Sequence, residues 1–365
     1  MIPSFTVGGT ITSLLSLLPV IRNKYDISLY ARSSLGTERN SFQSYNVLKE
    51  NIWLSTTIRS QGPFVYCVSR IIQLTSKLLR YCGINISPLL AKIGCKKINV
   101  SSYDLVISYQ ESLAGFVKFF PCKKACWIHS DISRGGKRGI NDFASFDYII
   151  CVSYFAKDSF LSVYPRLSDK VFVIYNNIDE ERILENSSLA TNLDSHFDTS
   201  KFTLISVGRF DPVKQFDKIP YIAKRIKERI GDRFVWYIVG CSPHYYNYQS
   251  LIQADINKLG LSSEVVLIDE KNNVYPYIKA SDLLVITSES ETFSLVAFEA
   301  RVLGTPIIMN DIPIAREIIK DKSGYIATIE EMPDIISEFY RNPFRVKSFI
   351  RLSSQSLSIF NSIVG

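Results

Sequence analysis

The sequence predicts an α/β protein made of two Rossmann-like domains, each a doubly wound parallel sheet, that face one another across a cleft. Its 365 residues are about twice the length of an ordinary domain. Short and nearly continuous apolar runs alternate with helical stretches, a pattern typical of parallel strands covered by helices on both faces. The alternation occurs twice, and a polar stretch over residues 179–201 lies between the two occurrences.

The apolar runs are the expected strands. In the first half they cover residues 26–31, 104–108, 125–129, 148–153 and 171–176. In the second half they cover residues 202–208, 234–240, 264–269, 282–288 and 306–310. We therefore predict a first domain over 1–178, a linker over 179–201, a second domain over 202–345 and a C-terminal helix over 346–365.

The beginning of the chain has the pattern of a strand end, a glycine turn and a helix. Only Met1 and Ile2 precede Pro3, whereas a strand usually has about 5–6 residues. Because the first strand normally lies in the middle of a doubly wound sheet, its loss would leave a gap in the core. We therefore expect that the natural chain begins several residues upstream, or that this product is an impaired truncation.

The composition is ordinary for a soluble enzyme, with 46% hydrophobic and 21% charged residues. The seven cysteines are an odd number without a zinc-type CxxC pair, so we expect reduced thiols. No apolar run in the sequence reaches the ~18 residues that a membrane span needs, and no secretion signal precedes the first apolar run. We expect a cytoplasmic protein, with the inner face of the cell membrane as an alternative location.

Charge is distributed unevenly along the chain. Residues 1–175 contain 21 Lys and Arg against 10 Asp and Glu, whereas the remainder contains 21 against 25. The basic first half suggests an anionic partner, such as acidic membrane lipids or a phosphorylated acceptor, although an ordinary solvated surface explains the same balance. Residues 64–81 are amphipathic and basic, which fits a helix packed on its own sheet better than one lying on a membrane.

A phosphate site is predicted after the first strand of the second half. Gly208 and Arg209 follow this strand, and Lys214 lies five residues further on. Ligands of open α/β sheets bind beyond the carboxyl ends of the strands, and Arg and Lys both suit phosphate oxygens. Taken alone, the two cations also fit an ordinary surface turn.

Two glutamates eight positions apart mark a second part of the site. The strand over 282–288 leads into a polar loop with Glu291, and the following helix contains Glu299. The start of that helix offers N–H groups and a positive dipole end to a phosphate, and a carboxylate can accept from two hydroxyls of a ribose. Alternatively, Glu291 caps the helix and Glu299 is a surface residue. The helix is largely apolar, however, and a glutamate within a buried helix needs a partner.

These stretches carry a family resemblance. SVGRFDPVKQFD, followed further along the chain by SESETFSLVAFEARVLGTPII, resembles the donor half of retaining nucleotide-sugar glycosyltransferases of the GT-B type (group 1, family 4). The signature of that family is the glutamate–seven–glutamate motif. IPSFTVGGT, FDYIICVS and VIYNNID resemble segments of its first domain, so the resemblance covers almost the whole chain.

The resemblance implies a role for each matching residue of the second domain. Arg209 and Lys214, after the turn at Gly208, would bind the donor diphosphate and stabilise its charge as it leaves. Glu291 would hold the hydroxyls of the transferred sugar, and Glu299 would hold the ribose. The remaining implied contacts are the backbone of Phe293, Ser294 and Leu295 with phosphate or sugar, and the loop 269–274, including Asn272, with the base.

In the first domain the resemblance implies that Gly8 and Gly9 let the backbone approach the diphosphate, where a bulkier residue would block it. His129, at the end of ACWIH, matches a position that often contacts the sugar, although a lone histidine is more often structural. The segment 346–365 would cross back to pack on the first domain. The implied catalytic set is His129, Arg209, Lys214 and Glu291.

Neither a metal ion nor another cofactor is expected. The sequence lacks the Asp-x-Asp motif that would hold a divalent ion on the diphosphate, and ESE over 289–291 is the nearest match. His196 and His244 lack metal-ligand spacing. Arg209, Lys214 and the helix start would take the place of the metal as fixed positive charge.

The expected reaction moves a sugar from a nucleoside-diphosphate sugar to a saccharide or lipid-linked saccharide acceptor, with retention at the anomeric carbon. Its expected setting is bacterial surface polysaccharide synthesis (capsule, O-antigen or exopolysaccharide), and no nucleic-acid partner is expected. Two alternatives stay open: a nucleotide-sugar epimerase on the same architecture, and a non-catalytic partner subunit of a glycosyltransferase complex. A dinucleotide dehydrogenase is disfavoured because no GxGxxG follows an expected strand.

Overall fold

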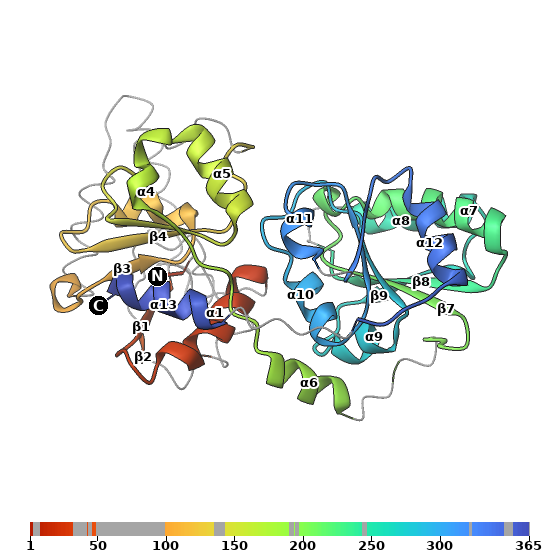
Figure 1. Cartoon of the computed structure of the whole chain (residues 1–365), viewed down its shortest axis with the longest axis horizontal. Coiled ribbons are helices and arrows are strands. Elements are labelled where there is room, and N and C mark those ends of the chain that lie inside the picture. The colour runs from red at the N-terminus through yellow and green to blue at the C-terminus, as the bar shows by residue number, and fades with distance from the viewer. Residues whose placement is uncertain are drawn as a thin grey trace, which may run out of the picture. The chain divides into compact units, whose positions relative to one another are not determined.

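The chain divides into two compact units, which are described one at a time (Figure 1). The first comprises Met1–Asn177 and Leu352–Gly365, and the second comprises Ile178–Arg351. The amphipathic stretch over 64–81 lies outside the described residues. The computed structural model describes residues 1–2, 8–31, 42, 46–48, 99–134, 143–189, 193, 197–242, 247–320, 323–346 and 353–364.

Parallel strands form the centre of the first unit. Four of them lie in the order β3 (Val106–Ser108), β4 (Lys124–Ile128), β5 (Tyr148–Cys151) and β6 (Val171–Val173). A second parallel pair consists of β1 (Ser28–Tyr30) and β2 (Asn46–Leu48). Four consecutive residues of β4 are buried, as expected for a strand covered on both faces.

Met1 and Ile2 connect these two groups of strands. The Ile2 N–H donates to the Tyr30 carbonyl at 2.8 Å. On the other side, the Tyr109 N–H donates to the Met1 carbonyl at 2.9 Å, and the Met1 amino group donates to the Ile107 carbonyl at 2.6 Å. Among the described residues, Met1 and Ile2 therefore occupy the position between β1 and β3 that the expected first strand takes in a doubly wound sheet.

Helix α1 (Gly9–Ile21) turns one apolar face inward. Ile11, Leu14, Leu18 and Ile21 recur at helical spacing and are buried. Pro19 lies within the helix without ending it. The other helical segments described in this unit are the 3₁₀ turns Val100–Ser102, Glu111–Leu113 and Pro165–Lys170 and the α-helices α4 (Ala114–Val117), α5 (Tyr154–Val163) and α13 (Ser353–Val364).

The last helix, α13, packs with residues of the first half. Phe360 is buried, and its ring centroid lies 5.8 Å from that of Tyr25 and 6.2 Å from that of Trp127. The Tyr25 hydroxyl also donates to Asn361 Oδ1 at 2.8 Å. Aromatic contacts around Trp127 therefore hold the end of the chain in the first unit.

Six parallel strands form the sheet of the second unit. Across the sheet they run β9 (Val265–Asp269), β8 (Phe234–Gly240), β7 (Phe202–Val207), β10 (Leu283–Ile286), β11 (Ile307–Asn310) and β12 (Gly324–Ala327). In this doubly wound order the chain starts in the middle, builds one half and returns to build the other. The neighbours β7 and β10 therefore flank the point where the winding reverses, and such sheets bind ligands at that point, beyond the carboxyl ends of the strands.

Helices cover both faces of this sheet. They are α6 (Glu180–Ser188), α7 (Ile219–Ile230), α8 (Tyr248–Lys258), α9 (Tyr275–Ala280), α10 (Leu295–Val302), α11 (Ala315–Ile318) and α12 (Met332–Arg341), with 3₁₀ turns at Pro212–Lys214 and Phe216–Lys218. Alternate residues of β8 point to opposite faces of the sheet. On one face, Trp236 and Ile238 pack in the main core with residues of α7, α8 and α12. Tyr237 stacks instead on Phe197, which also packs against Tyr277 of α9.

The stretch expected as a linker begins with a helix, and in this it differs from the prediction. The Asp179 carboxylate accepts from the Arg182 N–H at 3.1 Å, which caps the start of α6. Ile183 is buried, whereas most residues around it are exposed. The composition of 179–201 is polar because α6 buries only a narrow face, and a narrow apolar face is hard to separate from a linker in sequence.

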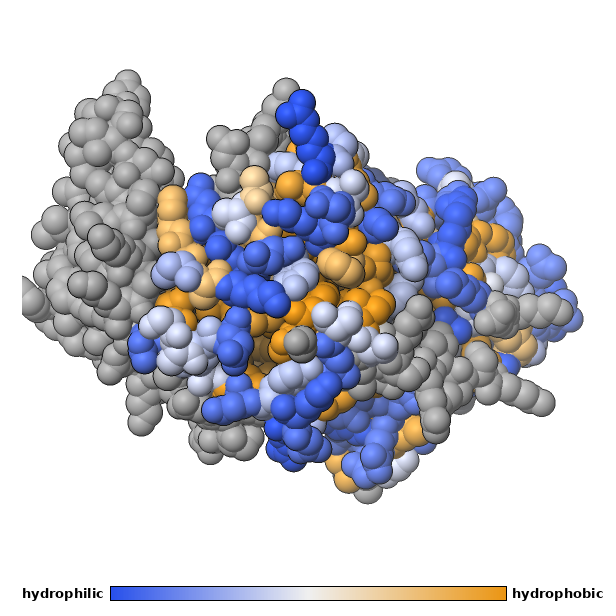
Figure 2. Space-filling model, turned by 60° about the vertical axis from the view of Figure 1, so that its left-hand side comes forward, coloured by the Kyte–Doolittle hydropathy of each residue, from blue (hydrophilic) through white to orange (hydrophobic). Residues whose placement is uncertain are grey.

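The exposed surface mixes apolar and hydrophilic side chains. Figure 2 shows one face, on which blue hydrophilic residues are interspersed with orange apolar ones. The large apolar side chains described as exposed are Tyr154, Leu184, Leu189, Tyr221, Leu251 and Tyr325. Within the described ranges, none of the helices is long and apolar enough to cross a membrane.

Candidate functional site

A close approach of two strand ends shapes the turn after β7. The Gly208 N–H donates to the Val239 carbonyl at 3.0 Å, and the Phe210 N–H donates to the Cys241 carbonyl at 2.9 Å. A Cβ on Gly240 would lie 1.7 Å from the Gly208 carbonyl oxygen, so this approach requires glycine on β8. The chain therefore leaves the sheet at Arg209, beside the end of β8.

The turn that follows places the Lys214 side chain against Gly208, at the end of β7. The Asp211 carboxylate accepts from the Val213 N–H at 3.1 Å and begins the 3₁₀ turn Pro212–Lys214. Gln215 then takes the left-handed conformation, with φ of 52°. A Cβ on Gly208 would lie 3.3 Å from Lys214 Cε, which shows how closely the lysine side chain runs beneath the turn.

The loop after β10 is tied to the same turn. The Thr287 hydroxyl donates to the Lys214 carbonyl at 2.7 Å, and the Glu289 N–H donates to the Val213 carbonyl at 2.9 Å. Asn310, at the end of β11, donates from Nδ2 to the Ser288 carbonyl at 3.1 Å. Hydrogen bonds therefore connect the segments at the carboxyl ends of β7, β10 and β11.

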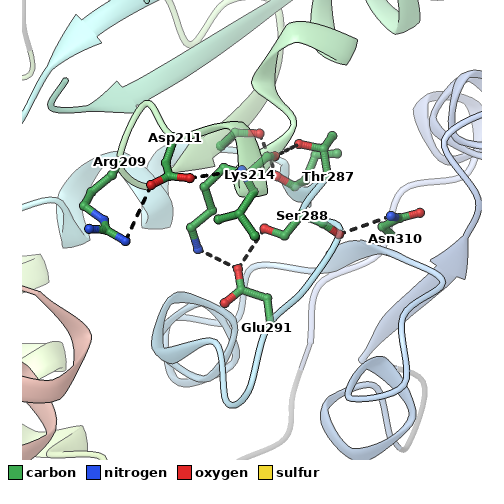
Figure 3. A network of polar contacts seen from close by, with 10 residues as sticks. Arg209, Asp211, Lys214, Thr287, Ser288, Glu291 and Asn310 are labelled. Carbon is green, nitrogen blue, oxygen red and sulfur yellow. Dashed lines mark hydrogen bonds and ion pairs between the residues drawn. The ribbon is translucent and has the colours of Figure 1, made fainter. Parts of the chain in front are cut away.

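Lys214 and Glu291 form an ion pair at this edge (Figure 3). Lys214 Nζ lies 2.6 Å from Glu291 Oε1, and the Ser288 hydroxyl donates to the same oxygen at 2.8 Å. The Lys214 and Glu291 side chains are only 20% and 12% exposed. At such low exposure the pair is less screened by water than a surface salt bridge.

Arg209 lies at the exposed side of the same network (Figure 3). Its side chain is 58% exposed, and its Nη2 is 3.9 Å from Asp211 Oδ2. Three residues predicted from separate parts of the sequence, Arg209, Lys214 and Glu291, are thus brought to one sheet edge. Two of them are cations, so this edge can bind an anion with more than one oxygen.

The start of helix α10 is the next part of the site. Ser294 precedes the helix in the left-handed conformation, with φ of 61°, and the Phe293 ring stacks on Phe298 with centroids 4.5 Å apart. Among the described residues, Ser294 Oγ is buried without a hydrogen-bond partner and caps no N–H of the helix. The first N–H groups of α10, from Leu295 onward, are therefore not capped by that hydroxyl.

Glu299 lies one turn into α10 and is half-buried. The Tyr275 hydroxyl is 3.4 Å from Glu299 Oε1. Burial raises the pKa of Glu299 to about 7, although Tyr275 and the charge of Arg182 act in the opposite direction. Burial likewise raises the pKa of Tyr275 to about 12, so this hydroxyl keeps its proton at neutral pH. Glu299 therefore changes charge near neutrality.

The loop between β9 and α9 is anchored to α6. Asn273 Nδ2 donates to the Asn186 carbonyl at 2.8 Å, and Lys279 Nζ lies 3.3 Å from Ser187 Oγ. Asn272, which was predicted to lie against a base, is exposed next to this anchor. Asn272 lies in the loop that follows β9, and its contact with a base stays a prediction.

The predicted residues of the first unit lie at the ends of α1 and β4. Gly8 precedes α1, and within the described residues nothing lies within 4 Å of a Cβ built on it. His129 follows β4, and its N–H donates to Glu111 Oε2 at 3.0 Å. The Tyr109 ring is 5.0 Å from the imidazole. Burial lowers the pKa of His129 to about 3, so the imidazole is neutral at physiological pH.

Several residues of these networks were missed in the sequence. Ser288 and Asn310 support Glu291, Tyr275 approaches Glu299, and Glu111 binds the peptide of His129. For Ser288 a signal was present, because it lies two residues after β10, the strand whose loop carries Glu291. The other three are distant in sequence from the groups they contact, and only the fold brings them there.

Metal-ligating side chains are not clustered in the described part of the chain. No group of three or more His, Cys, Asp or Glu residues there could hold a metal ion. Among the described cysteines, Cys122, Cys151 and Cys241 are free thiols.

Comparison with known proteins adds a family-model match over the second unit and a fold for the whole chain. Residues 191–347 match the family model described as Glycosyl transferases group 1. An uncharacterized 41.2 kDa protein in the cps region of Klebsiella pneumoniae is 25% identical over 329 residues, which cover 82% of each chain. The O-antigen chain mannosyltransferase RfbU of Salmonella typhimurium is 24% identical over 278 residues, covering 64% of this chain and 72% of that protein.

Solved structures share the architecture of the whole chain. Anabaena Alr3699/HepE in complex with UDP and glucose has a TM-score of 0.70 at 16% identity, covering 100% of this chain and 92% of that one. The lipopolysaccharide outer core galactosyltransferase WaaB in its apo form has a TM-score of 0.59 at 16% identity, covering 100% and 98%. The fold is therefore the two-domain GT-B architecture, and the Glycosyl transferases group 1 match, with its glycosyltransferase relatives, makes the chain a transferase enzyme.

Proposed function

We propose that the protein is a retaining glycosyltransferase that moves a sugar from a nucleoside-diphosphate sugar to a saccharide or lipid-linked saccharide acceptor. The observation that carries this proposal is the ion pair of Lys214 and Glu291 at the reversal point of the sheet. A cation for the diphosphate and a carboxylate for sugar hydroxyls lie next to one another there. A nucleoside-diphosphate sugar carries the complementary groups, anionic phosphate oxygens and sugar hydroxyls, close to one another.

The second unit supplies the proposed donor contacts. Lys214 and Arg209 bind the diphosphate, with the first turn of α10, which the Ser294 hydroxyl does not cap, directed at the same charge. Glu291 accepts from hydroxyls of the sugar. Glu299 accepts from the ribose, and the loop with Asn272 lies against the base. Preorganised positive groups of this kind stabilise the diphosphate as it leaves, and this is the main catalytic contribution that we assign to the protein.

We propose that the sugar keeps its anomeric configuration. The bond from the anomeric carbon to the phosphate oxygen breaks while the bond to the acceptor oxygen forms on the same face. The proton of the acceptor hydroxyl passes to the leaving phosphate oxygen. Positioning and charge stabilisation then suffice for catalysis. The anomeric proton coupling of the product, read by NMR, tests this: an inverted product would contradict it.

We further propose that fixed cations replace a metal ion in this site. Arg209 and Lys214 supply positive charge at the diphosphate position. The two carboxylates of this described network already face these cations: Asp211 faces Arg209 and Glu291 faces Lys214. Transfer is therefore expected to continue at an undiminished rate in excess EDTA. Loss of activity in EDTA that Mg²⁺ or Mn²⁺ restores would overturn this part of the proposal.

The names of the relatives support surface polysaccharide synthesis as the setting. One is encoded in a cps region, and another is an O-antigen chain mannosyltransferase. Structural neighbours were solved with UDP, and with UDP and glucose. We therefore propose a nucleotide-sugar donor and a glycan or lipid-linked glycan acceptor at the cytoplasmic face of the membrane. His129, Gly8 and Gly9 of the first unit are proposed to act on the same donor.

A panel of nucleotide sugars tests the proposal directly. The full chain is incubated with each UDP-, GDP- and dTDP-sugar, with and without lipid-linked saccharide extracted from a bacterial envelope. We expect one donor to release nucleoside diphosphate, faster with acceptor present. Conversion of the donor into an isomer without release would favour an epimerase. Binding of nucleotide with neither release nor isomerisation would favour a non-catalytic subunit.

A further inference from the structure

We infer that Ser288 is a positioning residue that holds Glu291 in place while Lys214 exchanges its partner, from Glu291 to the donor diphosphate. This inference rests on the proposed function. It adds a residue to which no role was assigned, and it gives the Lys214–Glu291 pair a purpose beyond supplying two separate contacts.

The two oxygens of Glu291 have different surroundings. Oε1 accepts from Lys214 Nζ at 2.6 Å and from the Ser288 hydroxyl at 2.8 Å. Oε2 accepts no hydrogen bond from the residues that the structure describes, and Figure 3 shows it pointing away from both donors. One oxygen is thus held by the protein, and the other is available to sugar hydroxyls.

Ser288 is fixed more firmly than Lys214. It is 2% exposed, two residues after the end of β10, and its carbonyl accepts from Asn310 of β11 at 3.1 Å. Thr287 and Glu289 on either side bond to the turn that carries Lys214. The hydroxyl of Ser288 therefore starts from a rigid point, whereas the long lysine side chain can move its charge by changing rotamers.

The ion pair sets a condition for anion binding. A diphosphate that binds Lys214 must replace Glu291 as its partner. The existing ion pair therefore reduces the net free energy that Lys214 contributes to diphosphate binding. Once the diphosphate has taken the lysine, the carboxylate has lost its positive partner. Ser288 still donates to Oε1 and keeps Glu291 oriented, and sugar hydroxyls supply the remaining hydrogen bonds.

This arrangement couples the two halves of the donor. Diphosphate binding to Lys214 frees Glu291 for the sugar, and sugar hydroxyls on Glu291 weaken its hold on Lys214, so each favours the other. After transfer, the free nucleoside diphosphate brings no sugar hydroxyl to Glu291. The ion pair then forms again and helps to release the product.

The test measures UDP affinity and transfer separately in the full chain. Glu291→Gln removes the charge that competes for Lys214, and we expect its UDP dissociation constant to fall about tenfold by calorimetry. Ser288→Ala leaves the ion pair intact, so we expect UDP affinity within about twofold of wild type but a turnover number about tenfold lower. Ser288→Thr keeps the hydroxyl and is expected to restore most of the turnover.

Matched controls separate these effects from general damage. Glu338→Gln removes an exposed carboxylate of α12, and Ser337→Ala removes a buried hydroxyl that donates to the Pro333 carbonyl at 2.7 Å. Neither is expected to change UDP affinity or turnover. Melting temperatures of all variants show whether they fold. The affinity measurement with Glu291→Gln keeps the test decisive if Ser288→Ala does not fold.

The outcomes distinguish this inference from the proposed function. If Glu291→Gln binds UDP more weakly than wild type, or if Ser288→Ala transfers at the wild-type rate, the inference is wrong while the glycosyltransferase proposal stands. GDP or dTDP replaces UDP in all variants if wild type binds it more tightly. A wild type that binds none of the three nucleotides contradicts the proposed function and this inference together.

Discussion

Lys214 and Glu291 neutralise one another at the point where β7 and β10 end. Their proximity could be predicted from the sequence because each follows an apolar strand, and the carboxyl ends of parallel strands lie together. Asn310 and Tyr275 could not be predicted in the same way. Their importance depends on which hydrogen bonds they make, and those depend on neighbours from other strands and helices.

Removing Lys214 is expected to slow transfer much more than it affects stability. Lys214→Ala takes away the less exposed of the two cations at the diphosphate position, and loss of one such contact typically lowers the rate by about 10²–10³. Steady-state transfer with the donor found in the panel measures this effect. Lys218→Ala removes a nearby lysine that pairs with Asp217 and is the control. Transfer by Lys214→Ala within about twofold of wild type would refute the assignment.

Glu299 is expected to make UDP affinity depend on pH. Its pKa is raised to about 7 by burial, and ribose hydroxyls donate to the ionised carboxylate. Binding therefore favours the deprotonated form, and the UDP dissociation constant should fall as the pH rises from about 6 to about 8. Calorimetry on wild type and Glu299→Gln measures this, because the titration of UDP itself is common to both.

Glu299→Gln is expected to bind UDP more weakly than wild type. Its UDP affinity should also lack the part of the pH dependence that the ionisation of Glu299 causes. Equal pH profiles would show that Glu299 does not contact the nucleotide.

The raised pKa of Glu299 also has a consequence for folding. Between about 4.5, its ordinary value, and about 7, the folded state holds a proton that the unfolded state has lost, so this group lowers stability as the pH rises through that interval.

At the scale of elements, the sequence was most informative where strands are long and apolar. The runs predicted for β7 to β11 overlap the strands of the second unit, whereas β12 (Gly324–Ala327) and β2 (Asn46–Leu48) were not predicted. β12 is short and lies at the sheet edge, where exposed Tyr325 interrupts the apolar pattern. Helix α6 was missed because its single buried face is narrow.

The approach of Gly240 to Gly208 is an element-scale contact that a substitution can test. In Gly240→Ala the new Cβ would lie 1.7 Å from the Gly208 carbonyl oxygen, so β7 and β8 must separate. We expect a loss of unfolding free energy of about 3 kcal/mol or more, and weaker UDP binding because the turn before Lys214 moves. Urea unfolding and UDP calorimetry measure the two effects.

Gly231→Ala is the matched control for this substitution. Gly231 has a positive φ of 71°, but among the described residues nothing lies within 4 Å of a Cβ there. Its alanine variant is expected to lose about 1–2 kcal/mol through backbone strain and to bind UDP normally. Similar losses of both stability and UDP affinity in the two variants would argue against a special role for the contact of β7 with β8.

At the scale of the whole molecule, charge separates the two halves of the sequence. The first 175 residues carry 21 basic and 10 acidic side chains, against 21 and 25 in the rest. The proposed donor residues that lie in one described network, Arg209, Lys214 and Glu291, belong to the second unit. Those predicted in the first unit, Gly8, Gly9 and His129, came from the resemblance rather than from a local pattern, since a glycine pair or a lone histidine is compatible with many roles.

The basic first half is expected to bring the enzyme to anionic membranes. Vesicles that contain anionic phospholipid should bind the full chain at about 50 mM salt and release it at about 500 mM, because salt screens charges at a surface. Vesicles of neutral phospholipid should not bind it. Flotation through a density gradient measures the bound fraction. Equal binding to both kinds of vesicle would show that charge does not determine membrane contact.

The central claim is that fixed cations at the reversal point of the second sheet bind the donor diphosphate. A crystal structure of the full chain with the sugar nucleotide selected by the panel tests this most directly. We expect the diphosphate oxygens within hydrogen-bond distance of Lys214 Nζ and the Arg209 guanidinium, with Glu291 against the sugar. A diphosphate bound elsewhere, with the Lys214–Glu291 pair still intact, would contradict the account.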